Sequence, residues 1–259
     1  MRWLRVSWRL LALGIVLMAI FPVYLLGWLV TRPWPATALR WRNFVFRSWS
    51  RAILGVLGVE VTVDGEPPAA PFYLVSNHLS YVDVVLLGSR LDAVFVAKSE
   101  VADWPVLGPV CRAIGTIFVD RTSRRDIPRV MERLQRTLAG GQGVVLFPEG
   151  TSTCGARVRP FRPPLLETAV RSGHPVSFVA ISYRTPTGLE SAHTAVCWWG
   201  GREFVGHLLN LLALPGFRAS LAFGDEKFLE ADRKRLAERL WQAVDHRFEP
   251  VVHLEEECA

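Results

Sequence analysis

The chain contains one long run of residues without a charged side chain, and this run limits what the N-terminal part can form. It extends over 21 residues, from Leu10 to Val30. As a helix it would be about 31 Å long, close to the roughly 30 Å thickness of the hydrocarbon core of a bilayer. Pro22 lies within the run and predicts a kink. We therefore expect a membrane-embedded helix, either as a kinked span or as one arm of a re-entrant hairpin.

Basic and aromatic residues flank this run, as is typical of interfacial anchors. Eight arginines and six of the ten tryptophans precede Glu60, the first acidic residue. A second helix is expected from about Ala36 to Leu57, with Arg40, Arg47 and Arg51 on the face that would lie against anionic lipid. Residues 1–58 are thus expected to form a membrane-anchoring helical hairpin.

A cleaved signal peptide is the alternative interpretation of the N-terminal segment. Residues 36–38 (A-T-A) match a cleavage site, and arginines precede the apolar run. However, the run is longer than a usual signal-peptide core of roughly 7–15 residues, which favours a retained anchor. Arginines flank both ends of the run, so the positive-inside rule does not fix its orientation.

The positive charge of the chain belongs to the N-terminal segment rather than to the part that follows. The formal net charge is +6, yet the residues from Glu60 onward include 22 basic and 24 acidic side chains. A nucleic-acid-binding domain carries its basic surface on the fold itself, so no nucleic-acid partner is expected. The wide spacing of the cysteines predicts free thiols in a reducing cytoplasm, not a zinc site or a disulfide framework; they are Cys111, Cys154, Cys197 and Cys258.

From Val59 onward, short apolar strands alternate with helices, a pattern typical of a mostly parallel sheet flanked by helices. Residues 59–259 are therefore expected to form a single α/β domain. The apolar stretch from Phe204 to Phe217 is either a core helix or a helix that docks on lipid. Strands are expected at 59–63, 72–75, 93–97, 116–119, 143–147, 176–181, 195–198 and 219–223, and helices at 81–89, 106–113, 124–139, 165–171 and 231–248.

The run N-H-L-S-Y-V-D follows the second expected strand and carries the first candidate for catalysis. If Ser80 caps the next helix, His78 precedes the helix and Asp83 lies in its first turn. The carboxylate can then accept a hydrogen bond from one imidazole nitrogen and leave the other free as a base. The nucleophile would be a substrate hydroxyl. The same spacing also fits a capping box, in which Asp83 only closes the helix start.

Two further runs place polar residues just past strand ends, where ligands bind in open α/β sheets. The run G-T-I-F-V-D-R ends at Arg121, whose guanidinium suits a phosphate or carboxylate. Arg121 would otherwise form a surface ion pair with Asp120 or Asp126. The run F-P-E-G-T places Glu149 and a glycine turn past another strand.

Together these runs resemble the glycerolipid acyltransferase family, whose best-known members are the bacterial 1-acyl-glycerol-3-phosphate acyltransferases. The family blocks N-H-x-S-x-x-D, G-x-I-F-x-D-R and F-P-E-G-T match in order, and a late V/I-P-V-x-x-V-A-I block is approximated from His174 to Ile181. The residues K-S-E at 98–100 and W-P-V-L-G at 104–108 are also similar. The resemblance covers about residues 59 to 225.

The resemblance implies the glycerolipid acyltransferase fold and a mechanism. His78 would take the proton of an acceptor hydroxyl, Asp83 would hold the imidazole tautomer, and the oxygen would attack the thioester of acyl-CoA or acyl-carrier protein. No metal or redox cofactor is implied. The substrate-binding residues would be Asn77, Ser80, Lys98, Arg121, Glu149, Gly150 and Thr151.

The acceptor expected from this resemblance is 1-acyl-sn-glycerol-3-phosphate, a membrane lipid. The enzyme is expected at the cytoplasmic face of a bacterial inner membrane. Another lyso-lipid, such as a lyso-ornithine lipid or a lysophospholipid, is the alternative acceptor. A membrane-attached thioester hydrolase and an inactive lipid-binding protein are the competing classes.

Two departures from the family pattern concern the head group of the acceptor. Ser152 stands where many relatives carry Arg after E-G-T, and the F-K-x-G of the family reads F-R-P-P at 161–164. Arg157, Arg159 and Arg162 follow closely and could bend back to replace the arginine that Ser152 displaces. If they do, the acceptor carries a phosphate; if they do not, a site with one arginine fits a less charged lyso-lipid better.

Overall fold

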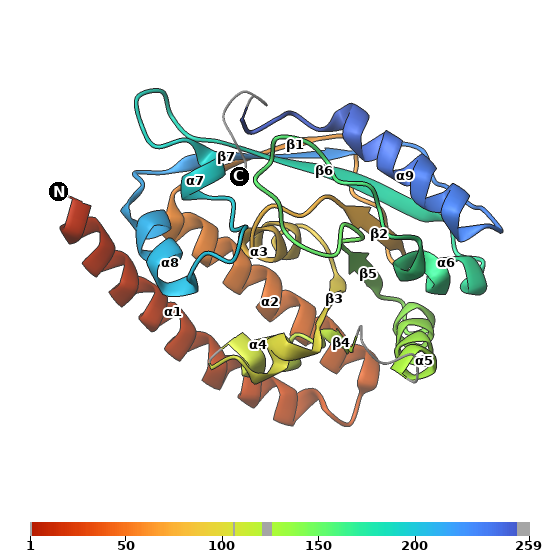
Figure 1. Ribbon diagram of the computed structural model, residues 1–259. Helices are drawn as coiled ribbons and strands as arrows, with labels where there is room; N and C mark the ends of the chain where they lie inside the picture. Colours follow the sequence, from red (N-terminus) through yellow and green to blue (C-terminus); the bar gives the residue numbers. More distant parts are fainter. Residues whose placement is uncertain (1, 106, 121–125, 253–259) are drawn as a thin grey trace.

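A computed structural model describes residues 2–105, 107–120 and 126–252 (Figure 1). Within these ranges a seven-stranded sheet has the order β1-β7-β6-β2-β5-β3-β4. The strands are β1 (Val59–Asp64), β2 (Tyr73–Ser76), β3 (Ala93–Lys98), β4 (Ile117–Val119), β5 (Gly143–Leu146), β6 (Val176–Arg184) and β7 (Phe217–Phe223). Only the β6–β7 pair is antiparallel, so the predicted mostly parallel mixed sheet is confirmed.

Helices flank the sheet, and in Figure 1 α2 and α3 lie below the strands while α9 lies above β6. The long helices are α1 (Arg2–Thr31), α2 (Pro35–Leu57), α5 (Asp126–Ala139), α8 (Phe204–Ala213) and α9 (Arg233–Arg247). The shorter helices are α3 (Val82–Gly88), α4 (Leu107–Ala113), α6 (Glu167–Ser172) and α7 (Ala192–Ala195), with single turns of 3₁₀ helix at η1 (Ser99–Asp103) and η2 (Pro163–Leu166).

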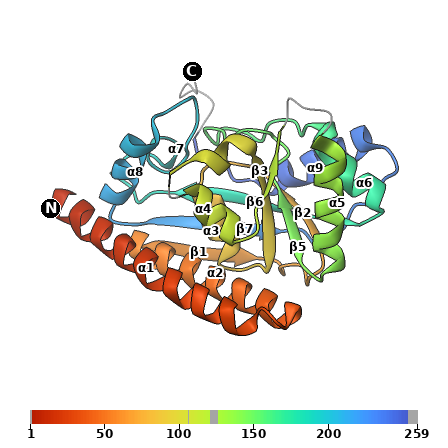
Figure 2. The same ribbon diagram turned by 90° about the horizontal axis from the view of Figure 1, so that it is seen from below.

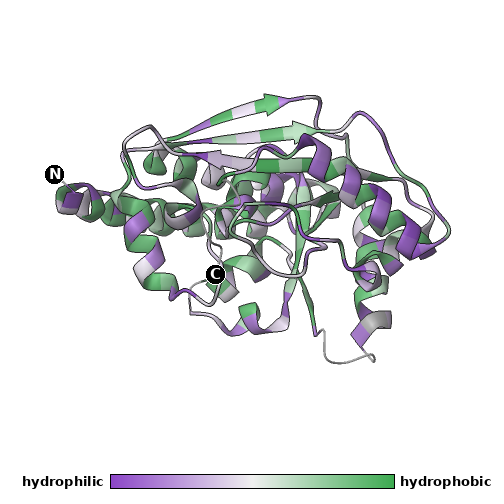
Figure 3. Cartoon of the chain, turned by 45° about the horizontal axis from the view of Figure 1, so that its top comes forward, coloured by the Kyte–Doolittle hydropathy of each residue, from purple (hydrophilic) through white to green (hydrophobic). Residues whose placement is uncertain are grey.

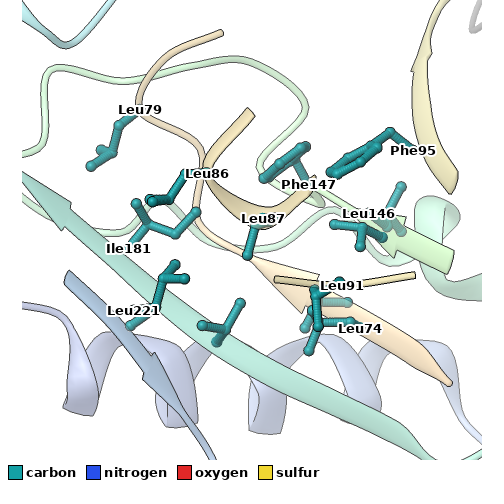
Figure 4. Packing of buried hydrophobic residues seen from close by; sticks show 14 of the residues in the cluster. Leu74, Leu79, Leu86, Leu87, Leu91, Phe95, Leu146, Phe147, Ile181 and Leu221 are labelled. Carbon is teal, nitrogen blue, oxygen red and sulfur yellow. The ribbon is translucent and has the colours of Figure 1, made fainter. Parts of the chain in front are cut away.

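The core lies between α3 and the central strands (Figure 4). Leu86 and Leu87 of α3 are fully buried, and Leu86 lies beside Ile181 of β6, while Leu74 of β2 lies beside Leu91. β2 and β5 are buried along their whole length, which explains why both read as continuous apolar runs. β2 pairs in parallel with both β5 and β6, so the loops that leave these strands start side by side at one edge.

One expected strand is wrong. Residues 195–198 are not part of the sheet; α7 ends at Ala195 and an irregular segment follows. Val196 and Cys197 are fully buried, and the backbone N–H of Trp198 donates to the carbonyl of Leu79 at 2.8 Å. This segment is apolar because it packs over the loop after β2, not because it pairs with another strand.

Helices α1 and α2 form the predicted hairpin and lie side by side in Figures 1 and 2. α1 continues through Pro22. The start of α1 is fixed to the domain by Arg9, whose side chain is buried. Its guanidinium donates to the carbonyls of Leu57 (2.9 Å), Leu212 (3.2 Å), Leu214 (2.5 Å) and Pro215 (3.1 Å), at the C-terminal ends of α2 and α8.

The arginine stripe of α2 faces the domain more than expected. Arg47 forms an ion pair with Asp92, and Arg51 donates to the carbonyl of Ser89 at 3.3 Å. Phe46 and Leu54 of the same helix are buried in the main core. α2 is therefore also a structural helix of the domain, and two arginines of the stripe contact Asp92 and Ser89 while Arg40 is exposed.

The outward face of α1 remains apolar and exposed. By length and composition, α1 is the one helix among the described residues that is long and apolar enough to cross a membrane. Figure 3 shows hydrophilic residues near its start and hydrophobic residues beyond. The exposed large apolar side chains of this segment are Trp3, Leu4, Trp8, Leu10, Leu11, Ile15, Met18, Phe21, Val23, Leu25, Leu26, Trp28, Leu29, Val30 and Trp34.

The cysteines differ in part from the expectation of free thiols. Cys111 and Cys197 are free. Cys154 is disulfide-bonded, so the expectation of a free thiol is wrong at this position. Cys258 lies outside the described residues.

Candidate active site

The candidate site lies where β2, β5 and β6 end together, and its central pair is His78 and Asp83. His78 follows β2, and Asp83 lies in the first turn of α3. The imidazole Nδ1 and the carboxylate Oδ2 are 2.7 Å apart. The chain turns between the two residues, as predicted, because α3 begins only at Val82.

Asp83 is fully buried and accepts several hydrogen bonds at once. Oδ2 also accepts from the backbone N–H groups of Leu79 (2.7 Å) and Ser80 (3.0 Å), and Oδ1 accepts from the hydroxyl of Tyr183 at 2.6 Å. The two interpretations of the sequence are thus compatible. Asp83 closes the turn before the helix, and the same oxygen contacts the imidazole.

The imidazole of His78 is held on one face and open on one edge. The ring stacks on Phe147 with a centroid distance of 4.2 Å and an interplanar angle of 18°. Its side chain is 23% exposed, whereas that of Asp83 is 0% exposed. Since Nδ1 contacts Asp83 and no residue in the described part of the chain bonds Nε2, the neutral imidazole can keep its proton on Nδ1 and offer Nε2 as a base.

Glu149 connects the loop after β5 to the loop that carries His78. Its Oε1 accepts the backbone N–H of His78 at 2.7 Å, and its Oε2 accepts that of Arg159 at 3.0 Å. Burial raises the pKa of this carboxyl to about 8, although the two N–H donors favour the ionised form. Thr153 adds a second link, because its N–H donates to the carbonyl of His78 at 2.9 Å.

Asn77 and Ser80 are buried and make internal hydrogen bonds. The amide of Asn77 pairs with the backbone of Ile181 in both directions, donating from Nδ2 to its carbonyl at 2.9 Å and accepting at Oδ1 from its N–H at 2.8 Å. The Ser80 hydroxyl accepts the N–H of Val82 at 3.3 Å. Both side chains therefore shape the loop around His78.

The remaining predicted substrate-binding residues differ in exposure. Lys98 is exposed at the end of β3. Gly150 has a φ of +80°, which favours glycine in the E-G-T turn, and Thr151 is half-buried. Arg121 lies outside the described residues. Within the described ranges, no group of three or more His, Cys, Asp and Glu side chains is placed to hold a metal ion.

The loop after the E-G-T turn folds back over it and carries Arg162. The backbone N–H of Arg162 donates to the carbonyl of Pro148 at 2.9 Å. A Cβ built on Gly150 would lie only 3.0 Å from Nε of Arg162, so this exposed side chain crosses directly over the turn. Ser152 instead points its hydroxyl at the carbonyl of Trp198.

Three residues of the site were not identified from the sequence. Tyr183 comes from the end of β6. Tyr81 places its hydroxyl 3.1 Å from Nδ1 of the buried His207, which lies on α8. Trp198 belongs to the segment that joins the loops after β2 and β5. Each contact joins residues more than 45 positions apart, and no local spacing in the sequence reveals such pairs.

Comparison with known proteins gives consistent matches. A family model described as acyltransferase matches residues 59–183. The lyso-ornithine lipid O-acyltransferase of Rhizobium meliloti is 32% identical over 256 residues, which cover 93% of this chain and 85% of the relative. The 1-acyl-sn-glycerol-3-phosphate acyltransferase of Neisseria meningitidis is 33% identical over 153 residues, covering 58% of this chain and 60% of the relative.

The fold also matches a solved structure. The crystal structure of the 1-acyl-sn-glycerophosphate acyltransferase PlsC from Thermotoga maritima aligns with a TM-score of 0.67 and 22% identity, covering 100% of both chains. At this identity the likeness establishes the fold. The family match and the similarity to the Rhizobium enzyme agree with this fold and with the His78–Asp83 pair at the carboxyl edge of the sheet. The chain therefore belongs to the acyltransferase family and is an enzyme of that family.

Proposed function

We propose that this enzyme transfers an acyl chain from a thioester to the hydroxyl group of a membrane lyso-lipid. The observation that carries the proposal is the 2.7 Å contact between His78 Nδ1 and the buried Asp83 carboxylate, with Nε2 at the open edge of the ring. A base held in this way needs a hydroxyl to act on, and none of the described hydrogen bonds provides one from the protein.

The atoms of the proposed reaction balance without a metal or redox cofactor. Nε2 of His78 takes the hydroxyl proton while the oxygen attacks the thioester carbonyl. The C–S bond breaks, and the proton passes to the departing thiolate of CoA or of acyl-carrier protein. Asp83 stabilises the imidazolium that exists between these two steps.

Two acceptors are candidates, and they differ in charge. 1-Acyl-sn-glycerol-3-phosphate, the acceptor expected from the sequence blocks and named for the Neisseria relative, needs a guanidinium for its phosphate. Arg162 over Gly150 supports this acceptor. A lyso-ornithine lipid is the second candidate, because the alignment with the Rhizobium enzyme extends over 256 residues and covers 93% of this chain.

We place the enzyme at the cytoplasmic face of a bacterial inner membrane. The exposed apolar face of α1, with tryptophans near its ends, supports attachment to a bilayer. The cytoplasmic face follows from the proposed donors, since acyl-CoA and acyl-carrier protein are water-soluble and cytoplasmic. Protease accessibility of a C-terminal tag in spheroplasts tests this placement.

A mass-spectrometric assay tests the function directly. The purified full-length protein in mixed micelles is given acyl-CoA alone, then acyl-CoA with each of the two acceptors in turn. We expect an acylated lipid and free CoA only when an acceptor is present, and the preferred acceptor is the one consumed at the lower concentration. Free CoA without acceptor would instead identify a hydrolase, and no consumption in any sample would contradict an enzymatic role.

A further inference from the structure

Tyr183 contacts the candidate dyad, His78 and Asp83, from a distant part of the chain. It lies at the end of β6, 100 residues after Asp83, and donates its hydroxyl to Oδ1 at 2.6 Å. The other oxygen, Oδ2, accepts from the His78 ring and from the backbone N–H groups of Leu79 and Ser80. Among the described residues, Tyr183 is therefore the hydrogen-bond donor to Oδ1 of Asp83.

The surroundings fix this hydroxyl in place. Tyr183 is 3% exposed, and its ring packs edge-on against Phe217 of β7 with a centroid distance of 5.8 Å. Burial and the nearby Asp83 charge raise the pKa of Tyr183 well above its ordinary value, so the phenol remains a neutral donor. Because β6 also pairs with the side chain of Asn77 through Ile181, one strand holds both ends of the loop that carries His78.

We infer that Tyr183 is a positioning residue of the acyl transfer, which fixes the orientation of the Asp83 carboxylate and thereby sets the basicity of His78. The inference rests on the proposed function. A buried carboxylate shares its charge among its donors, and the loss of one donor concentrates negative charge on the remaining contacts. The imidazolium form of His78 then becomes more favourable, and less free base is present at a given pH.

The other titratable groups around Asp83 in the described part of the chain come from three further elements. Tyr81 lies at the start of α3, Glu149 in the loop after β5, and Cys197 after α7. Burial raises the pKa of the Tyr81 phenol and of the Cys197 thiol, so both stay neutral near pH 7. Glu149 titrates near pH 8, but every variant proposed below retains it.

The test is the pH profile of kcat/KM for the full-length enzyme and for Tyr183→Phe, with the acceptor that the wild type uses. We expect the acid limb of the variant to shift upward by about 0.5 to 1 pH unit, which reduces kcat/KM below the limb by about three- to tenfold. The matched control is Tyr73→Phe. Tyr73 is a buried tyrosine on β2 whose hydroxyl lies 2.8 Å from the Thr168 hydroxyl instead of Asp83. We expect the acid limb of Tyr73→Phe to stay at the pH of the wild-type limb.

A second substitution keeps the test informative if Tyr183→Phe folds poorly. Tyr183→3-fluorotyrosine retains the ring and makes the hydroxyl a stronger donor, and we expect the acid limb to move downward. An unmoved limb in both Tyr183 variants, with an unfolding midpoint lowered as much as in Tyr73→Phe, would overturn the inference and leave a purely structural tyrosine. A wild-type enzyme without acyl transfer would instead contradict the proposed function.

Discussion

The carboxylate of Glu149 accepts the backbone N–H of His78 at 2.7 Å. The single acidic side chain of the F-P-E-G-T block thus binds the protein backbone. Its second oxygen accepts the N–H of Arg159, so one side chain joins the loop after β2, the loop after β5 and the segment that crosses the E-G-T turn. Glu149 therefore holds these three segments of the polypeptide together beside His78.

The stability of the protein is expected to depend on pH through this carboxyl. Burial raises the pKa of Glu149 from the ordinary 4.5 to about 8. The folded state then binds more protons than the unfolded state between these values, so the free energy of unfolding falls as pH rises through that window. Glu149→Gln removes the titration. Thermal midpoints in detergent from pH 5 to 8 should show the wild type losing its advantage over the variant as pH increases; parallel curves would contradict the raised pKa.

The dyad itself gives the largest expected effect on turnover. We expect His78→Ala to lower kcat by about 10²- to 10⁴-fold, because a general base contributes a factor of this size. Asp83→Asn should also be impaired, since an amide can donate toward Nδ1 and favour the wrong tautomer. Both variants are measured by acyl transfer and by thermal unfolding. A folded His78→Ala protein with near wild-type turnover would show that another group is the base.

Arg9 is expected to be essential for docking of α1. Truncation to alanine leaves carbonyls at the ends of α2 and α8 without their charged donor, which should cost about 3 kcal/mol or more of unfolding free energy. Limited proteolysis in detergent should then cleave between α1 and the domain. Arg2→Ala is the control, since its contact with Asn210 is exposed and should change stability by less than about 0.5 kcal/mol. Equal proteolysis of the two variants would contradict the role of Arg9.

Recognition of the acceptor's head group is expected to depend on Arg162. If the acceptor carries a phosphate, Arg162→Ala should raise its KM far more than that of the thioester, and Arg121→Ala should act in the same direction. Ser152→Arg should improve or leave unchanged the use of 1-acyl-sn-glycerol-3-phosphate. Arg157→Ala, also an exposed arginine of this loop, is the control. Unchanged acceptor KM in Arg162→Ala would exclude this guanidinium from the head-group site.

Membrane binding is expected to depend on the outward side chains of α1. Leu11, Ile15 and Met18 are exposed by 66%, 58% and 75%, so replacing all three with serine removes apolar contact with lipid but little internal packing. Sedimentation with anionic vesicles should show weaker binding at an unchanged thermal midpoint. Retained binding would assign attachment to another surface.

Much of the fold was predictable because the local pattern agrees with the tertiary structure. α5 and α9 carry clear apolar stripes, and β2 and β5 are continuous apolar runs, so these elements were predicted within about two residues. The strand predicted at residues 195–198 was wrong because there the local pattern and the tertiary structure disagree. Burial without strand pairing makes Val196 and Cys197 as apolar as a strand, and the sequence pattern does not distinguish the two cases.

The site was predictable where its contacts are local. The His78–Asp83 contact spans five residues, so the turn between them could be derived from helix geometry. The partners of this pair come from elsewhere: Tyr183 lies on β6 and Phe147 follows β5. The orientation of Arg47 and Arg51 toward the domain likewise depends on the loop that contains Asp92, which a single-helix pattern cannot show.

The stacking of Phe147 on His78 has a consequence for chirality. One face of the imidazole is covered by the phenyl ring and Nδ1 is occupied by Asp83, so the base offered to a hydroxyl is Nε2 at the open edge. An acceptor held by its polar head meets that edge from one direction, and mirror-image acceptors then place their fatty tails on opposite sides. The fixed ring therefore makes the site handed, so the two enantiomers of a lyso-lipid present their hydroxyl groups to Nε2 in different orientations.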